Sequence, residues 1–109
     1  MAELLSFPLP LWAIIDPRTH RPVSATREGI RFLPVFEDEG GADRFVAENQ
    51  LPGIPIVEFR NRQEIQELFE KAQAMGCSHA CFMSARRPGM TGYELPELIR
   101  SLRADPSQN

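Results

Sequence analysis

The most constraining feature of the sequence is an amphipathic helix pattern between Asn61 and Gly76. Apolar residues recur in this stretch at intervals of three and four, at Ile65, Leu68, Phe69, Ala72 and Met75. This spacing places them along one side of a helix. Asn61 can cap the first turn, Glu64 follows three residues later, and Gly76 permits the left-handed turn that ends many helices. We therefore predict a helix over about residues 62–75, whose apolar side must be buried against another layer of structure.

Short apolar runs rich in β-branched and aromatic residues supply that second layer. They predict strands at residues 11–15, 23–26, 30–36, 56–59 and 78–83. Two further helices are predicted, one over about 41–50 and a short last one that has Pro96 in its first turn and contains Leu98, Ile99 and Leu102. Pro34 lies inside the 30–36 run and cannot donate a hydrogen bond to a neighbouring strand. We therefore expect this strand to lie at an edge, to carry a bulge or to end near Pro34.

The order of these elements indicates the fold class. From residue 30 onward strands alternate with helices, an order that favours parallel strands joined by right-handed crossovers. The opening strands flank the turn-rich segment 16–22 and are expected to pair antiparallel. We predict an α/β (α+β) fold, with a single mixed sheet of about four to five strands and helices packed on it. The length of 109 residues suits one domain, which we place at 1–104, followed by a polar tail at 105–109.

Composition excludes several classes of protein. Hydrophobic residues make up 42% and charged residues 25%, values typical of a globular domain and not of a disordered chain. The net charge of -3 argues against a duplex nucleic-acid partner, and no apolar run approaches the roughly 20 residues of a membrane span. The first ten residues contain Glu3 and two prolines but no basic residue, so we expect no secretory signal and a cytoplasmic location.

Cys77, His79 and Cys81 alternate, a pattern that invites a metal-site or disulfide interpretation. On a strand their side chains would share one face, but Cys77 and Cys81 would lie about 13 Å apart. That separation is too large for a disulfide or for two ligands of one zinc ion. Two cysteines are also too few for a disulfide scaffold, which favours a reducing compartment. We therefore expect buried thiols, no metal site and no cofactor.

Three acidic residues, Glu37, Asp38 and Glu39, lie between a predicted strand and a predicted helix. Neighbouring carboxylates can transfer protons or bind a hard cation. They can also complement the positive end of a helix dipole. We favour the helix role, since a helix is predicted to begin directly after them.

The segment 85–93 is the most site-like stretch, and we predict it to be a loop after the last strand. It contains four candidate ligand-binding residues, Arg86, Arg87, Thr91 and Tyr93. Two guanidinium groups beside glycines, at the carboxyl end of a parallel strand, can hold a carboxylate or a phosphate. The same loop can instead be solvated, or it can contact an acidic patch on a protein partner. The chain has no Gly-x-Ser-x-Gly elbow or cysteine signature and only two histidines, so we nominate no catalytic residue.

One stretch in the first half resembles a known family. The run 32–39 reads Phe-Leu-Pro-Val-Phe-Glu-Asp-Glu and is followed by Ala42 and Phe45. This pattern is similar to the N-terminal domain of the SseB-like (enhanced serine sensitivity) family of small bacterial proteins. The resemblance extends over residues 11–83, although Gly40 and Gly41 differ from the helix-forming residues expected there. It implies a small accessory or interaction domain, and it carries no catalytic or binding residue over to this chain.

Two functional hypotheses follow. The first is a non-catalytic cytoplasmic module that acts through contacts with a protein partner or with a second copy of itself. The alternative is a domain that binds a small anion or a nucleotide-type ligand through Arg86 and Arg87. A hydrolase or transferase ranks behind both, because no nucleophile can be nominated for it.

Overall fold

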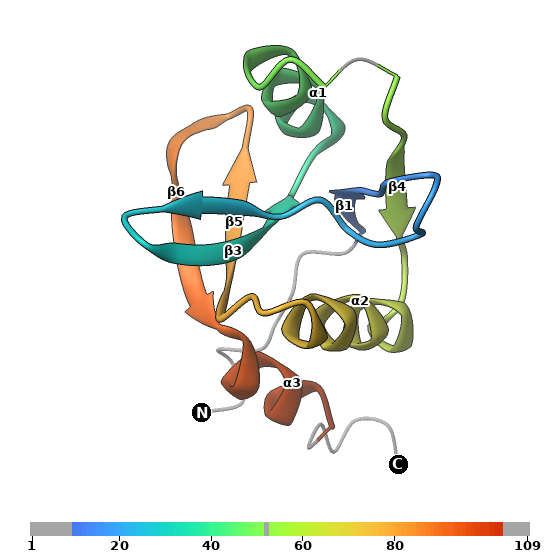
Figure 1. The fold of residues 1–109 in the computed structure, drawn as a ribbon, viewed down its shortest axis with the longest axis vertical. Helices are drawn as coiled ribbons and strands as arrows, with labels where there is room; N and C mark the ends of the chain where they lie inside the picture. The colour runs from blue at the N-terminus through green and yellow to red at the C-terminus, as the bar shows by residue number, and fades with distance from the viewer. Residues whose placement is uncertain (1–9, 52, 104–109) are drawn as a thin grey trace.

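The computed structural model describes residues 10–51 and 53–103 (Figure 1). Two of the expectations fall on other residues. The secretory-signal argument rests almost wholly on residues 1–9, and the polar tail was placed at 105–109, so both lie outside the described part of the chain.

Within the described residues, a single mixed sheet of six strands carries three helices. The strands are β1 (Leu11–Ile14), β2 (Ala25–Arg27), β3 (Ile30–Phe36), β4 (Ile56–Phe59), β5 (His79–Ser84) and β6 (Arg87–Glu94). The helices are α1 (Glu39–Glu48), α2 (Arg62–Ala74) and α3 (Leu95–Arg103). The sheet order is β4-β1-β3-β5-β6, and β2 pairs with β3 off this path. Only β3 and β5 pair in parallel. The predicted class is confirmed, with one strand more than the upper end of the expected range.

The additional strand is β6, which occupies most of the segment predicted as a loop. That prediction was wrong, since Arg87–Glu94 pairs antiparallel with β5 through a turn at Ala85 and Arg86. The sequence signal is weak because Pro88, Gly89 and Gly92 are typical of loops. Pairing with an existing strand overrides those local preferences. The Phe82 and Tyr93 rings also meet edge to face across the two strands, with centroids 5.5 Å apart.

Pro34 lies in the interior of the sheet, contrary to the expectation of an edge, a bulge or a strand end. β3 continues past Pro34 to Phe36 and is flanked by β1 and β5. Backbone groups of Arg31 and Glu37 bond toward β5, so Pro34, three residues from each, faces the opposite side. On that side the partner changes from β2, which reaches Phe32, to β1, which begins at Phe36. The missing N–H of Pro34 therefore falls in the gap between two partner strands.

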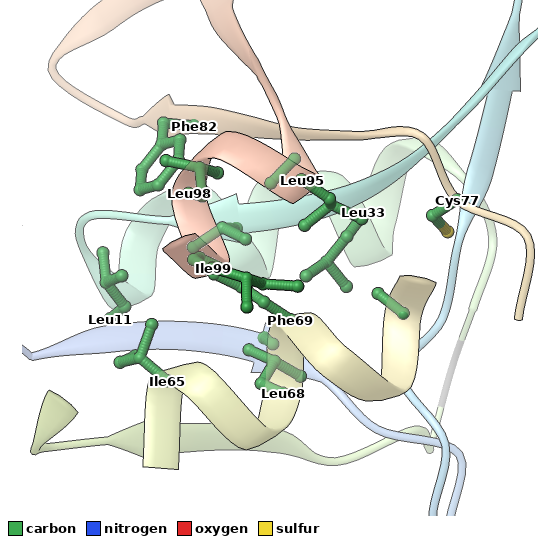
Figure 2. Close-up of a cluster of buried hydrophobic side chains, with 14 of the residues drawn as sticks. Leu11, Leu33, Ile65, Leu68, Phe69, Cys77, Phe82, Leu95, Leu98 and Ile99 are labelled. Carbon is green, nitrogen blue, oxygen red and sulfur yellow. The ribbon is translucent and has the colours of Figure 1, made fainter. Parts of the chain in front are cut away.

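The helices cover both faces of the sheet. α2 and α3 pack together on one face, over alternate residues of β1, β3 and β5 such as Leu33 and Phe82 (Figure 2). α1 covers the other face, where the buried cluster includes Ile14, Phe36 and Ala42. The alternation of side chains along each strand thus divides the core between two layers.

The predicted stripe of α2 is confirmed. Ile65, Leu68, Phe69 and Ala72 are buried, and the helix ends at Ala74, with Met75 as its cap. The Asn61 side chain accepts a hydrogen bond from the Glu64 N–H at 2.9 Å, as expected of an N-cap. The Glu64 carboxylate accepts from the Arg60 N–H instead of the Asn61 N–H, so the reciprocal half of the capping box is displaced by one residue.

We expect Phe69→Ala to be one of the most destabilising single changes in α2. The ring is fully buried between the helix pair and the sheet. Its loss should lower the free energy of unfolding by about 3–5 kcal/mol. Urea denaturation followed by circular dichroism measures this, with Gln63→Ala on the exposed side of the same helix as the control. A similar loss in both variants would contradict the assigned orientation of α2.

Candidate functional site

The four candidate residues of the segment 85–93 do not converge on one point. Arg86 is exposed in the turn between β5 and β6, and Arg87 begins β6. Thr91 and Tyr93 are exposed further along the strand, opposite Phe82 and Ala80. At about 3.4 Å per residue, Arg87 and Tyr93 are separated by about 20 Å of strand. The candidates therefore mark an edge of the sheet and do not enclose a small ligand between them.

The best-defined polar arrangement centres on the Asp38 carboxylate. Its Oδ1 accepts hydrogen bonds from the N–H groups of Gly41 at 2.7 Å and Ala85 at 3.0 Å. Its Oδ2 accepts a bond from the Ser84 hydroxyl at 2.5 Å. One side chain thus caps α1 and also binds the first residues of the β5–β6 turn. We call Asp38, Gly41, Ser84 and Ala85 the Asp38 network.

Parallel strands explain why these residues meet. β3 and β5 run in the same direction, so their carboxyl ends lie at one edge of the sheet. Asp38 follows β3 and Ser84 ends β5, and the Glu37 N–H continues the ladder to the Met83 carbonyl at 2.9 Å. The predicted helix role of the acidic residues is confirmed for Asp38, which is the N-cap of α1. The role of Ser84 was missed, because no local pattern links it to a residue 46 positions earlier.

Gly41 is required by the close approach of α1 to the turn. A Cβ at Gly41 would lie 3.0 Å from Asp38 Oδ1 and 3.2 Å from the Ala85 backbone nitrogen. At Gly40 a Cβ would lie 3.3 Å from the Ala85 methyl group, a less severe contact. Gly41, more than Gly40, therefore makes room for the Asp38 network.

The Asp38 carboxyl group is held in its charged form. The Ser84 hydroxyl lowers its pKa most, followed by the Ala85 N–H, while burial opposes the shift and the Gly41 N–H and the Arg86 charge reinforce it. Ser84 in turn accepts a hydrogen bond from the Arg86 N–H at 3.0 Å. The base beside the Ser84 hydroxyl is the Asp38 carboxylate itself, and its lowered pKa makes it a weak proton acceptor. The network is suited to joining α1 to the hairpin, and it contains no activated nucleophile.

The two cysteines lie apart from this network. Both thiols are buried and free, and burial raises the pKa of each above its ordinary value. Cys77 precedes β5 and belongs to the core under α2. Contrary to the expectation, it therefore does not share a strand with Cys81. His79 Nδ1 lies 2.7 Å from the Ser78 hydroxyl. Over residues 10–51 and 53–103, no cluster of three His, Cys, Asp or Glu side chains could hold a metal ion.

Comparison with known proteins adds no identification. No protein-family model matches the chain, and no curated protein matches it. The resemblance to SseB-like domains therefore stays a prediction from residues 32–45. Within the described part of the chain, no helix is both long enough and apolar enough to cross a membrane.

We expect Asp38→Asn to lower stability by about 1–3 kcal/mol at neutral pH. Asparagine keeps the oxygen that accepts from the Gly41 and Ala85 N–H groups, but its NH₂ group cannot accept from the Ser84 hydroxyl. Because the folded-state pKa lies below the ordinary 3.8, the carboxylate stabilises the fold above that pH. The contribution is lost as the pH falls through the lowered pKa. Urea titrations at several pH values should show the gap between the two proteins narrowing in acid. A gap that widened in acid would be inconsistent with this network.

Gly41→Ala should destabilise the protein although alanine favours helices by about 1 kcal/mol over glycine. The added methyl group must separate α1 from the Ala85 backbone, which costs about 1–3 kcal/mol. Gly40→Ala is the matched control in the same turn of the same helix, and it should lose less stability than Gly41→Ala. Thermal unfolding of both variants measures the difference. An equal or larger loss in Gly40→Ala would show that the close approach is misassigned.

Proposed function

We propose that this chain is a non-catalytic interaction module that pairs with a second copy of itself through the outer edge of β6. The observation that carries the proposal is an open strand of eight residues at one end of the sheet. An edge strand offers a row of unpaired backbone groups to another strand. Among the described elements, none pairs with the outer side of β6.

The backbone geometry of β5 determines which groups of β6 are free. The Glu37 N–H donates to the Met83 carbonyl, so the backbone of Met83 faces β3. Neighbouring residues of a strand face opposite ways, and Phe82 therefore faces β6. Its partner Thr91 faces inward, as does Leu95, whose N–H donates to the Ser78 carbonyl at 2.9 Å. Inward and outward positions alternate between these two residues.

Met90, Gly92 and Glu94 consequently direct their backbone N–H and C=O groups away from the sheet. Two copies of β6 can pair antiparallel about a two-fold axis that passes beside Gly92. Met90 of each copy then forms backbone hydrogen bonds with Glu94 of the other. In that register Thr91 lies opposite Tyr93 of the second copy, on one face of the joined sheet. Tyr93 has 42% of its surface exposed, and a β-branched residue opposite an aromatic ring is a favourable cross-strand pair.

The other edge of the sheet is less suited to pairing. β4 has four residues, half the length of β6. Short edge strands are one way in which proteins avoid unwanted pairing. An isologous dimer through β6 is also closed, because the same edge is used on both copies.

Two further observations support a binding role over a catalytic one. The polar groups of the Asp38 network satisfy one another and leave no activated nucleophile. The SseB-like resemblance of residues 32–45 also implies an accessory or interaction domain.

The free, buried Cys77 and Cys81 suit a reducing compartment such as the cytoplasm.

The alternative of an anion bound at Arg86 and Arg87 is less well supported. Arg86 lies close enough to Asp38 to lower the pKa of that carboxyl group. The Arg86 charge therefore already acts on the Asp38 carboxylate, with which an incoming anion would have to compete.

The proposal is tested by replacing Gly92 with proline. Gly92→Pro removes an outward N–H and places the ring on the outer side, while the inward bonds of Thr91 and Tyr93 remain. We expect light scattering to show a concentration-dependent dimer for the native chain and a monomer for Gly92→Pro. Gly92→Ala is the control, since its Cβ makes the same 3.4 Å approach to Cys81 Sγ but keeps the N–H.

A native chain that stays monomeric at high concentration would overturn self-pairing. A dimer that survives in a folded Gly92→Pro variant would move the interface away from β6. Thermal unfolding of each variant establishes that it is folded.

A further inference from the structure

We propose that a cavity between α1, β2 and the β5–β6 hairpin binds a small organic anion with an apolar body. The cavity has a volume of about 250 Å³. Its lining includes Arg27 from β2, Arg44 and Phe45 from α1, and Met83, Ser84 and Met90 from the hairpin. We call it the Arg27–Arg44 cavity. Its lining does not include Arg86, and Met90 is the residue that it shares with the outward-facing positions of β6.

The three walls come from segments that are distant in the sequence. Figure 1 shows the β2–β3 hairpin lying across β5 and β6, with α1 beside their turn. Arg27 precedes the tight turn at Glu28 and Gly29, both of which have positive φ. This turn connects β2 to β3, and Arg27 lies directly before it and lines the cavity. The position of Arg27 therefore depends on the pairing of β2 with β3.

The charges of the cavity are unbalanced. The side chains of Arg27 and Arg44 make no hydrogen bond or ion pair with any described residue, whereas Arg60 and Arg103 are paired with Glu58 and Glu70. Glu48 is the one acidic side chain among the residues lining the cavity. Two guanidinium groups that line one cavity repel each other until an anion lies between them. Guanidinium groups bind carboxylate and phosphate oxygens in a planar, two-pronged geometry.

Apolar groups define the rest of the ligand. Phe45, Met83 and Met90 are half-buried and line the same cavity. Methionine side chains adapt to irregular apolar groups, and Phe45 also packs against Phe36, with ring centroids 5.5 Å apart. Ligand pockets commonly measure about 300–1,000 Å³. A cavity of about 250 Å³ therefore fits an anion with one ring or a short chain better than a nucleotide.

The helix N-terminus beside the cavity does not supply the binding group. Asp38 already accepts the Gly41 N–H, and its negative charge would repel an anion placed at the start of α1. The anion is held instead by the two arginine side chains, one from each side of the cavity. This arrangement makes binding sensitive to either arginine alone.

The test is a titration of the ¹⁵N-labelled chain with phenyl phosphate, followed by amide chemical shifts. We expect saturable shifts at Phe45, Ser84 and Met90, and weaker binding of inorganic phosphate, which lacks the apolar group. Arg27→Gln and Arg44→Gln should each weaken phenyl phosphate binding by about tenfold, the loss expected for a hydrogen bond to a charged group. Arg18→Gln is the matched control, since it removes an equal charge from an exposed residue outside the cavity.

Several results would overturn the proposal. These are the absence of saturable shifts, shifts centred elsewhere, equal affinity for inorganic and phenyl phosphate, or an equal loss in Arg18→Gln. Arg27 and Arg44 are exposed and unpaired in the described structure, so neither variant should change the melting temperature. Should one do so, Arg27→Lys and Arg44→Lys keep the charge and should retain part of the affinity. Repeating the titration in Gly92→Pro separates ligand binding from self-pairing.

Discussion

The Asp38 carboxylate is the interaction on which the arrangement of the second half depends. It joins the start of α1 to the end of β5, two elements that are otherwise separated by β4 and α2 in the sequence. Three donors stabilise the charge of the carboxylate, and the nearby Arg86 charge adds a smaller contribution. Gly41 permits the approach, and the hairpin turn is thereby held against α1. That contact keeps the hairpin beside α1, and both elements line the Arg27–Arg44 cavity.

The proposed binding surfaces both arise from strand pairings at the margins of the sheet. β6 is an edge strand because no described element pairs with its outer side. Backbone groups of successive residues point alternately to the two neighbouring strands, so the bonds between β3 and β5 determine which groups of β6 are free. The Arg27–Arg44 cavity depends on the pairing of β2 with the first residues of β3, which positions Arg27. Beyond Pro34 the partner of β3 on that side is β1 instead. A dimer through β6 and a ligand in the cavity would engage the same hairpin from two sides. The two surfaces remain chemically distinct, one using backbone groups and the other using arginine side chains.

Local patterns predicted the parts of the fold that local physics determines. The apolar stripe of α2 and its Asn61 N-cap were predicted correctly, because helix periodicity and N-cap chemistry act within a few residues. The helix role of Asp38 could be predicted for the same reason. β6 was missed because its glycines and proline favour a loop until β5 is present to pair with it. Pro34 was misplaced, since only the tertiary partners on either side determine whether an N–H is needed there.

The sequence by itself determined the fold class, the helix that organises the core and the exclusion of a disulfide framework. These follow from composition, from periodicity and from spacings along one chain segment. The tertiary structure alone decided that Ser84 meets Asp38, that the segment after β5 becomes an edge strand, and that Arg27 and Arg44 share a cavity. Each of these depends on residues brought together by strand pairing. No short-range pattern records such contacts, because their stability comes from the whole sheet.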